Sequence, residues 1–174
     1  MKQRHKLICC EYLKPSQRIQ VIDLWNAEYP KQMAFQNPDQ FDEYLYNLQR
    51  VHHLLLINDD HHISGWAITF EREEDIWFAL IIEGNLQGMG YGKRILNHLK
   101  EKEPVLNAWV IDHDRDQKQN GQAYQSPLSF YIKNGFETVP EIRLELGNIS
   151  AVKIRWSNKA IAKPKLSSPQ TNKL

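Results

Sequence analysis

The chain has 174 residues, 41% of them hydrophobic, which is enough for one domain with a sizeable core. Its 22 Lys and Arg residues nearly balance its 21 Asp and Glu residues, so the net charge of +1 argues against nucleic acid or a membrane surface as the main partner. The longest apolar stretch, residues 76–82, is far shorter than a membrane-spanning helix, and the basic start lacks the apolar core of a signal peptide; we therefore expect a cytoplasmic protein.

The first half of the chain is expected to form one strand, two helices and three antiparallel strands. The apolar run 6–12 favours a strand, and helical spacing of apolar residues predicts a helix over residues 15–29, which Pro30 ends. A second helix is predicted after Asn37, because Pro38 suits a first helical turn. Strand-like runs separated by turn-forming residues follow at 53–58, 63–71 and 75–82.

The second half is expected to add two helices and three more strands. A glycine-rich loop precedes a predicted helix over residues 89–102, and the strand 105–111 should then lie parallel to the strand 75–82. A polar loop, 112–125, leads to a short helix, and a final hairpin turns at Gly147 and Asn148. The predicted ranges of the short helix and the hairpin strands are 126–133, 142–146 and 151–156. We expect a folded domain over residues 1–156 and a disordered tail over 157–174, which is rich in Pro, Ser and Lys.

The glycine-rich loop is the strongest sign of a binding site. The first backbone N–H groups of a helix attract an anion, and glycines allow that anion to approach closely. Lys93 and Arg94 occupy a helical turn that normally favours acidic residues, which suits a bound phosphate. The loop follows four strands rather than one, unlike a dinucleotide fold, and Gly92 and Lys93 lack the following Ser or Thr of a P-loop.

Two motifs resemble those of the GNAT superfamily of acetyl-CoA-dependent N-acetyltransferases. The segment Gln87-Gly88-Met89-Gly90-Tyr91-Gly92 matches the pattern Gln/Arg-x-x-Gly-x-Gly/Ala, and residues 130–136, from Phe130-Tyr131 to Gly135-Phe136, resemble the family's second motif. The resemblance covers residues 7–156, since the predicted order β-α-α-β-β-β-α-β-α-β-β is also that of the family. It implies an α/β (α+β) fold, a single GNAT-type domain with a mixed central sheet of about seven strands flanked by four helices.

The resemblance also implies roles for particular residues. Backbone groups of the glycine segment would bind the pyrophosphate of acetyl-CoA, and main-chain groups at the end of the fourth strand would hold the pantetheine arm. The implied cofactor-binding residues are Leu80, Ile81, Ile82, Gln87, Gly88, Met89, Gly90, Tyr91, Gly92 and Lys93. Tyr131 would be the catalytic general acid that returns a proton to the CoA thiolate. The alternative is that Tyr131 is only a packed aromatic residue.

The general base stays open at this point. Several family members place a Glu or His on the fourth strand, but Phe78 and Ile76 occupy the matching positions. The acidic candidates near the expected site are Glu28, Glu74, Asp75 and Asp112, each of which could equally be a solvated surface carboxylate, and a water wire would also serve. Glu83 adjoins the phosphate loop and would have to point away from the cofactor.

Three further features bear on the acceptor. The loop 112–125 is longer than most connections, so it could line the acceptor or cofactor channel through Tyr124. Of the aromatic residues in the first two helices, most should be core, but one or two, with Met33 and Phe35, could shape an apolar acceptor pocket. The histidine pairs at 52–53 and 61–62 are expected to be exposed residues of turns and strand ends, and no metal is expected.

The preferred hypothesis is an N-acetyltransferase that moves the acetyl group of acetyl-CoA, its cosubstrate, to a primary amine by direct attack in a ternary complex. One alternative is a catalytically silent CoA-binding regulatory or interaction module, favoured by the apolar residues where a base is often found. Another is a protein lysine or N-terminal acyltransferase. A homodimer is one option for its assembly, because the final hairpin has an edge that could pair.

Overall fold

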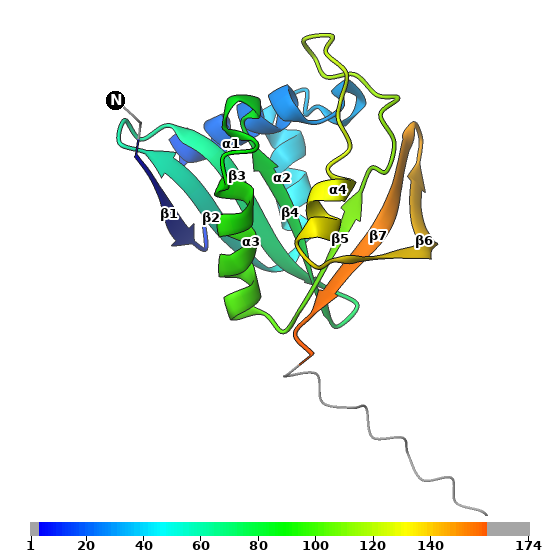
Figure 1. The fold of residues 1–174 in the computed structure, drawn as a ribbon. Helices are drawn as coiled ribbons and strands as arrows, with labels where there is room; N and C mark the ends of the chain where they lie inside the picture. The colour runs from blue at the N-terminus through cyan, green and yellow to red at the C-terminus, as the bar shows by residue number, and fades with distance from the viewer. Residues whose placement is uncertain (1–3, 160–174) are drawn as a thin grey trace, which may run out of the picture.

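Seven strands form one mixed sheet in the computed structural model, which describes residues 4–159 (Figure 1). The strands are β1 (His5–Cys10), β2 (Gln49–Asn58), β3 (Ile63–Arg72), β4 (Asp75–Ile82), β5 (Val105–Val110), β6 (Glu137–Leu146) and β7 (Ile149–Ser157). The helices are α1 (Pro15–Glu28), α2 (Pro38–Tyr46), α3 (Tyr91–Lys102) and α4 (Leu128–Lys133), with short 3-10 helices at Lys31–Met33 and Gly84–Leu86. This single α+β domain confirms the predicted fold class and element order.

The sheet order is β1-β2-β3-β4-β5-β7-β6, and the neighbours are antiparallel except for the parallel pair β4 and β5. The meander β2-β3-β4, the parallel contact of β4 with β5, and the β6-β7 hairpin were all predicted. Four strands start earlier than predicted, by one residue in β1, two in β7, four in β2 at Gln49 and five in β6 at Glu137. The predicted disordered tail overlaps β7 at Ser157, and residues 160–174 lie outside the described residues, so the tail stays a prediction.

Helices cover both faces of the sheet. α3 and α4 lie on one face and α1 and α2 on the other (Figure 1). Alternation along the strands sends successive side chains to opposite faces, so Phe78 joins the core under α3 and α4 while Trp77 joins the core under α1 and α2. Among residues 4–159, no helix combines the length and apolarity that crossing a membrane requires.

The feature that positions the site is an opening between β4 and β5. Within the described chain these strands pair only at Trp77 and Asn107. The buried Asn107 holds this closed end, because its Nδ2 donates to the Ile76 carbonyl at 3.1 Å and its Oδ1 accepts from Arg155 Nη1 at 3.3 Å. Beyond this point β4 keeps a strand partner on the β3 side only, so the sheet is open where β4 ends.

Candidate active site

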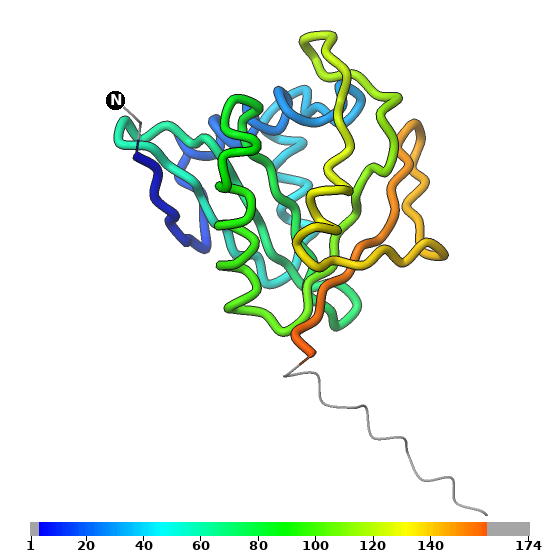
Figure 2. Tube along the Cα trace, viewed as in Figure 1, coloured from blue at the N-terminus to red at the C-terminus, as the bar shows by residue number. Residues whose placement is uncertain are grey.

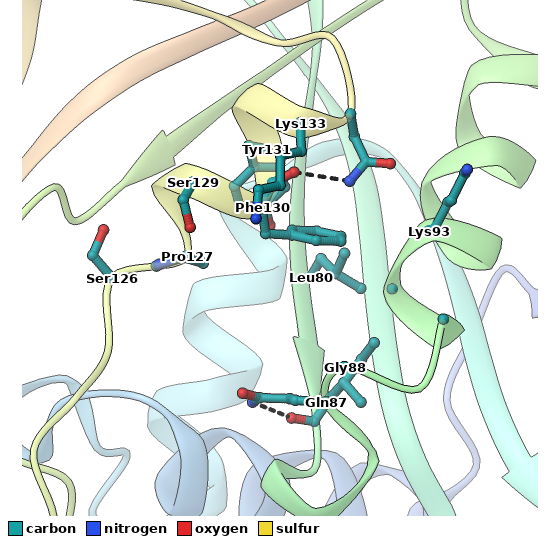
Figure 3. A pocket seen from close by; sticks show the side chains of 14 residues that line it. Leu80, Gln87, Gly88, Lys93, Ser126, Pro127, Ser129, Phe130, Tyr131 and Lys133 are labelled. Carbon is teal, nitrogen blue, oxygen red and sulfur yellow. Dashed lines mark hydrogen bonds between the residues drawn. The ribbon is translucent and has the colours of Figure 1, made fainter.

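A cavity of about 510 Å³ lies between α4 and the start of α3, above the end of β4 (Figure 3). It brings together eight of the residues predicted for the site, which are Leu80, Ile82, Gln87, Gly88, Gly90, Gly92, Lys93 and Tyr131. The sequence interpretation missed the rest of its lining, Ser126, Pro127, Ser129, Phe130, Lys133 and Asn134. The two motifs, about forty positions apart in the chain, therefore form opposite walls of one cavity.

Three residues predicted for the site do not line this cavity with their side chains. Ile81 is buried in the core under α1 and α2, and Met89 is 50% exposed. Tyr91 packs edge-on against His5, and its hydroxyl lies 3.2 Å from His5 Nδ1. Their predicted roles rest on main-chain groups, so these side-chain positions leave those roles as predictions.

The glycines of the loop serve different physical purposes. Gly88 and Gly90 have φ of +75° and +89°, a conformation that glycine adopts without strain, and a Cβ on either would meet no atom within 4 Å. Open space therefore lies beside both backbones. At Gly92, by contrast, a Cβ would lie 2.9 Å from Phe130 Cζ, so this glycine allows α3 and α4 to approach each other.

The electrostatics of the cavity favour an anion. α3 begins without an acidic residue in its first turn, and Lys93 from that turn and Lys133 from α4 both line the cavity. The lining, as described, contains no Asp or Glu. Arg94 points elsewhere, since its Nη1 donates to the His5 carbonyl at 2.9 Å. The site therefore fits a phosphate group near the N-terminus of α3.

A second cavity, of about 490 Å³, meets the first at Leu80, Pro127 and Tyr131. Its lining comes from α1, α2, the connection between them, and β3 to β7, so it continues to the other face of the sheet through the opening between β4 and β5. Most of its lining residues are aromatic or aliphatic. Two ligands that enter from opposite faces would therefore meet beside Tyr131.

Tyr131 has a packed ring and an unengaged hydroxyl. The ring centroid lies 5.8 Å from that of Phe78 and 5.5 Å from that of Phe136, and the residue is 5% exposed. Within residues 4–159 its hydroxyl has no hydrogen-bond partner. Burial raises the pKa of Tyr131 well above the ordinary value, so the hydroxyl is protonated at neutral pH.

The acidic candidates for the base line neither cavity. Glu28 pairs with Lys118 at 2.6 Å and also accepts from the Gly84 N–H. Asp75 pairs with Arg155, and Asp112 binds Arg143 through both oxygens at 2.9 Å, which lowers the pKa of Asp112. Glu74 lies exposed in the turn before β4, and Glu83 contacts His62.

The long loop 112–125 lines part of the second cavity. The sequence had left open whether this loop borders the acceptor or the cofactor. Figure 2 traces it as the yellow-green segment that rises above the sheet. Its middle is fixed by the Lys118–Glu28 ion pair and by a hydrogen bond from the Lys31 N–H to the Gln117 carbonyl. Tyr124, 7% exposed, lines the cavity.

Four residues from α1, α2 and their connection also line the second cavity, namely Trp25, Tyr29, Met33 and Tyr44. Phe35 instead packs behind them, with its ring 4.8 Å from Trp25. The prediction that the paired histidines are exposed is wrong for His53. It is buried because it faces the core and accepts a hydrogen bond from Trp66 Nε1 at 3.1 Å. Among residues 4–159 no three His, Cys, Asp or Glu side chains form a group that could hold a metal ion.

Comparison with known proteins identifies the fold. A scan against protein-family models finds no match, and neither does a search of curated sequences. Solved structures do match: an aminoglycoside 6'-N-acetyltransferase complexed with coenzyme A has a TM-score of 0.67 at 14% identity, covering 91% of this chain and 99% of that one. A GNAT superfamily phosphinothricin acetyltransferase from Sinorhizobium meliloti, in complex with AcCoA, has a TM-score of 0.62 at 9% identity and 98% coverage of both chains. The ribosomal-protein-S18-alanine N-acetyltransferase from Escherichia coli has a TM-score of 0.60 at 12% identity, covering 88% of this chain and 94% of that one. The structural neighbours of this chain are thus GNAT-family acetyltransferases.

Proposed function

We propose that this chain, which has the GNAT acetyltransferase fold, transfers the acetyl group of acetyl-CoA to a primary amine of a small molecule or peptide. The observation that carries the proposal is the meeting of two cavities at Leu80, Pro127 and Tyr131. One cavity suits an anionic ligand, and the other suits an apolar one. Direct transfer between two bound ligands requires this arrangement, because the reacting atoms must come within about 3–3.5 Å.

The first cavity is proposed to bind acetyl-CoA. The amides beside Gly88 and Gly90 would face the pyrophosphate, and Lys93 would add charge. The edge of β4 that lacks a β5 partner leaves main-chain groups near Leu80 and Ile82 for the pantetheine arm. The Ile82 carbonyl already accepts from Gln87 Nε2 at 3.1 Å, which ties the loop to the end of this strand.

The chemistry is proposed to be direct attack in a ternary complex. Bound acetyl-CoA would supply the acetyl group as a thioester. The amine nitrogen forms a bond to the carbonyl carbon as the carbon–sulfur bond breaks, and the Tyr131 hydroxyl donates its proton to the departing thiolate. The acylated nitrogen then loses its extra proton to solvent, and Tyr131 regains a proton from solvent before the next cycle. Burial raises the pKa of Tyr131, but the same environment also raises the pKa of the CoA thiol. The proton donor and the proton acceptor therefore remain similar in basicity.

The described lining of the two cavities contains no carboxylate that could take a proton from the amine. An ammonium group that enters an apolar cavity loses hydration, which lowers its pKa and favours the neutral, nucleophilic amine. The proton of the amine can therefore leave to solvent rather than to a side chain. We propose that no carboxylate of this chain acts as the base.

The first test is thermal unfolding with and without acetyl-CoA, followed on the same sample by release of free thiol with a panel of amines. We expect stabilisation that increases with acetyl-CoA concentration, together with thiol release for at least one acceptor. Stabilisation without release for any amine would favour the catalytically silent CoA-binding module. No stabilisation would contradict the assignment of the glycine segment.

A further inference from the structure

The second cavity has one charged residue among its described lining, Arg72. No Asp or Glu side chain lines it. An acceptor with several positive charges would therefore enter an aromatic cavity without a counter-charge, and burying an unpaired ammonium group is costly. This composition argues against polyamines and against other polycationic amines as acceptors.

Arg72 lies at the end of β3 and is free of carboxylates within residues 4–159. Its Cζ lies 5.1 Å from the ring of Phe70 and 5.2 Å from that of Trp77. Of the acidic residues close to it in the chain, Glu71 pairs with Arg50 and Asp75 pairs with Arg155. Glu73 and Glu74 are exposed in the turn after β3, and neither forms an ion pair with Arg72 in the described chain. The guanidinium is therefore held by aromatic rings, with its hydrogen-bonding capacity towards an anion unused.

Two further observations mark the same end of the cavity as positive. Lys153 Nζ lies 5.0 Å from the Trp77 ring, and the buried Trp77 Nε1 has no hydrogen-bond partner in the described chain. Burial raises the pKa of Tyr44 to about 12, and the positive charge of Arg72, whose side chain is exposed at the end of β3, opposes that rise. A ligand oxygen with negative charge would be stabilised here.

The distance between Arg72 and the junction with the acetyl-CoA cavity limits the shape of the ligand. The cavity meets the acetyl-CoA cavity at Leu80, and Arg72 contacts Trp77, three residues earlier on β4. Three strand residues span about 10 Å. The space between is bordered by aromatic rings, including those of Trp109 and Tyr124. An α-amino acid, whose amine and carboxylate share one carbon, cannot place one group at each end.

We propose that the acceptor is a monoamine with a flat apolar body and a carboxylate at the end opposite the amine. The amine faces Tyr131, the aromatic rings contact the body, and Arg72 binds the carboxylate. This inference rests on the proposed acetyl transfer and names its substrate class.

The test compares 4-(aminomethyl)benzoate with benzylamine, which lacks only the carboxylate, and with spermidine, using the full chain with acetyl-CoA. We expect the KM for 4-(aminomethyl)benzoate to be at least about tenfold lower than for benzylamine, because a charge-assisted Arg–carboxylate bond contributes that much or more. Arg72→Gln should raise the KM for 4-(aminomethyl)benzoate about tenfold and leave that for benzylamine within about twofold. Arg4→Gln, which alters an exposed arginine outside the cavity, should change neither.

Equal KM values for the two aromatic amines, no effect of Arg72→Gln, or a preference for spermidine would overturn the inference and leave acetyl transfer intact. Calorimetric binding of 4-(aminomethyl)benzoate to the full chain separates the two proposals, because it requires no reaction. If transfer fails but this probe binds and Arg72→Gln weakens its binding, the cavity assignment stands and the proposed function falls. If the probe does not bind, the inference is wrong.

Discussion

Tyr131 is a single residue that combines a tightly packed ring with a hydroxyl that could act in catalysis. Its ring is held by Phe78, Phe130 and Phe136, while the residue lines both cavities and its hydroxyl has no partner in the described chain. The packing fixes where the proton donor lies, so the two interpretations of this tyrosine do not exclude each other. A substitution that removes only the oxygen separates them.

Tyr131→Phe should therefore lower turnover by about 10²–10⁴-fold, because the departing thiolate loses its proton donor. Acetyl-CoA affinity and the midpoint of thermal unfolding should barely change, since the ring contacts remain. Steady-state kinetics and calorimetry on the same preparation measure both. Tyr46→Phe, at a tyrosine that is 89% exposed, is the matched control and should have no effect. A Tyr131→Phe rate within a few-fold of the parent would leave this residue a packing role only.

The sequence located the residues of the cavity whose backbone conformation is unusual, but not those that depend on how elements pack. Gly88 and Gly90 follow a local pattern, and the structure gives both positive φ. Ser129 and Lys133 join the cavity only because α4 packs against the start of α3. The partner of Asp112 could not be predicted either, since Arg143 lies 31 positions later.

At the scale of elements, the N-terminus of α3 is the predicted anion site. Lys93→Ala should weaken acetyl-CoA binding by about three- to tenfold, because it removes one charge from a partly solvated phosphate site. Lys102→Ala, at the exposed end of the same helix, should leave the affinity unchanged. Calorimetric titration of the parent, Lys93→Ala and Lys102→Ala with acetyl-CoA measures the three affinities. Equal affinities would mean that Lys93 does not belong to the site.

The closed end of the opening between β4 and β5 depends on Asn107. Asn107→Leu keeps the approximate volume but removes the bonds to the Ile76 carbonyl and to Arg155, so we expect a loss of about 1–3 kcal/mol in the free energy of unfolding. Urea denaturation measures it. The same change at Asn97, exposed on α3, should cost much less. Similar losses at both positions would mean that these bonds do not secure the junction of the two strands.

For the whole molecule, alternation of apolar residues and turn chemistry predicted the order of helices and strands along the chain and the antiparallel meander, because both follow from local properties of the chain. They could not predict that β4 and β5 separate after one pair, since this depends on what packs between the strands. The second cavity is a product of the complete fold, with walls from helices, strands and the long loop. Its chemistry therefore became visible only in three dimensions.

The stability of the whole fold should also depend on the protonation of one buried histidine. Burial, and to a lesser extent the charge of His52, lowers the pKa of His53 from its ordinary value to about 4. In the unfolded chain the same side chain binds a proton near its ordinary pKa of about 6.5. Between these pH values the unfolded state binds more protons than the folded state, so stability rises with pH.

The loss of folding stability due to His53 is absent above about pH 6.5 and grows as the pH falls. It is complete below about pH 4, where it amounts to on the order of 3 kcal/mol. His53→Gln keeps an acceptor near Trp66 Nε1 but does not titrate, so its thermal midpoint should fall less on acidification from pH 7 to pH 4.5 than that of the parent. His113→Gln, at a less buried histidine in the loop, should follow the parent. Parallel curves for the parent and His53→Gln would mean that His53 accepts a proton in the folded state as readily as in the unfolded chain, and that the acid sensitivity of the fold resides in its carboxylates.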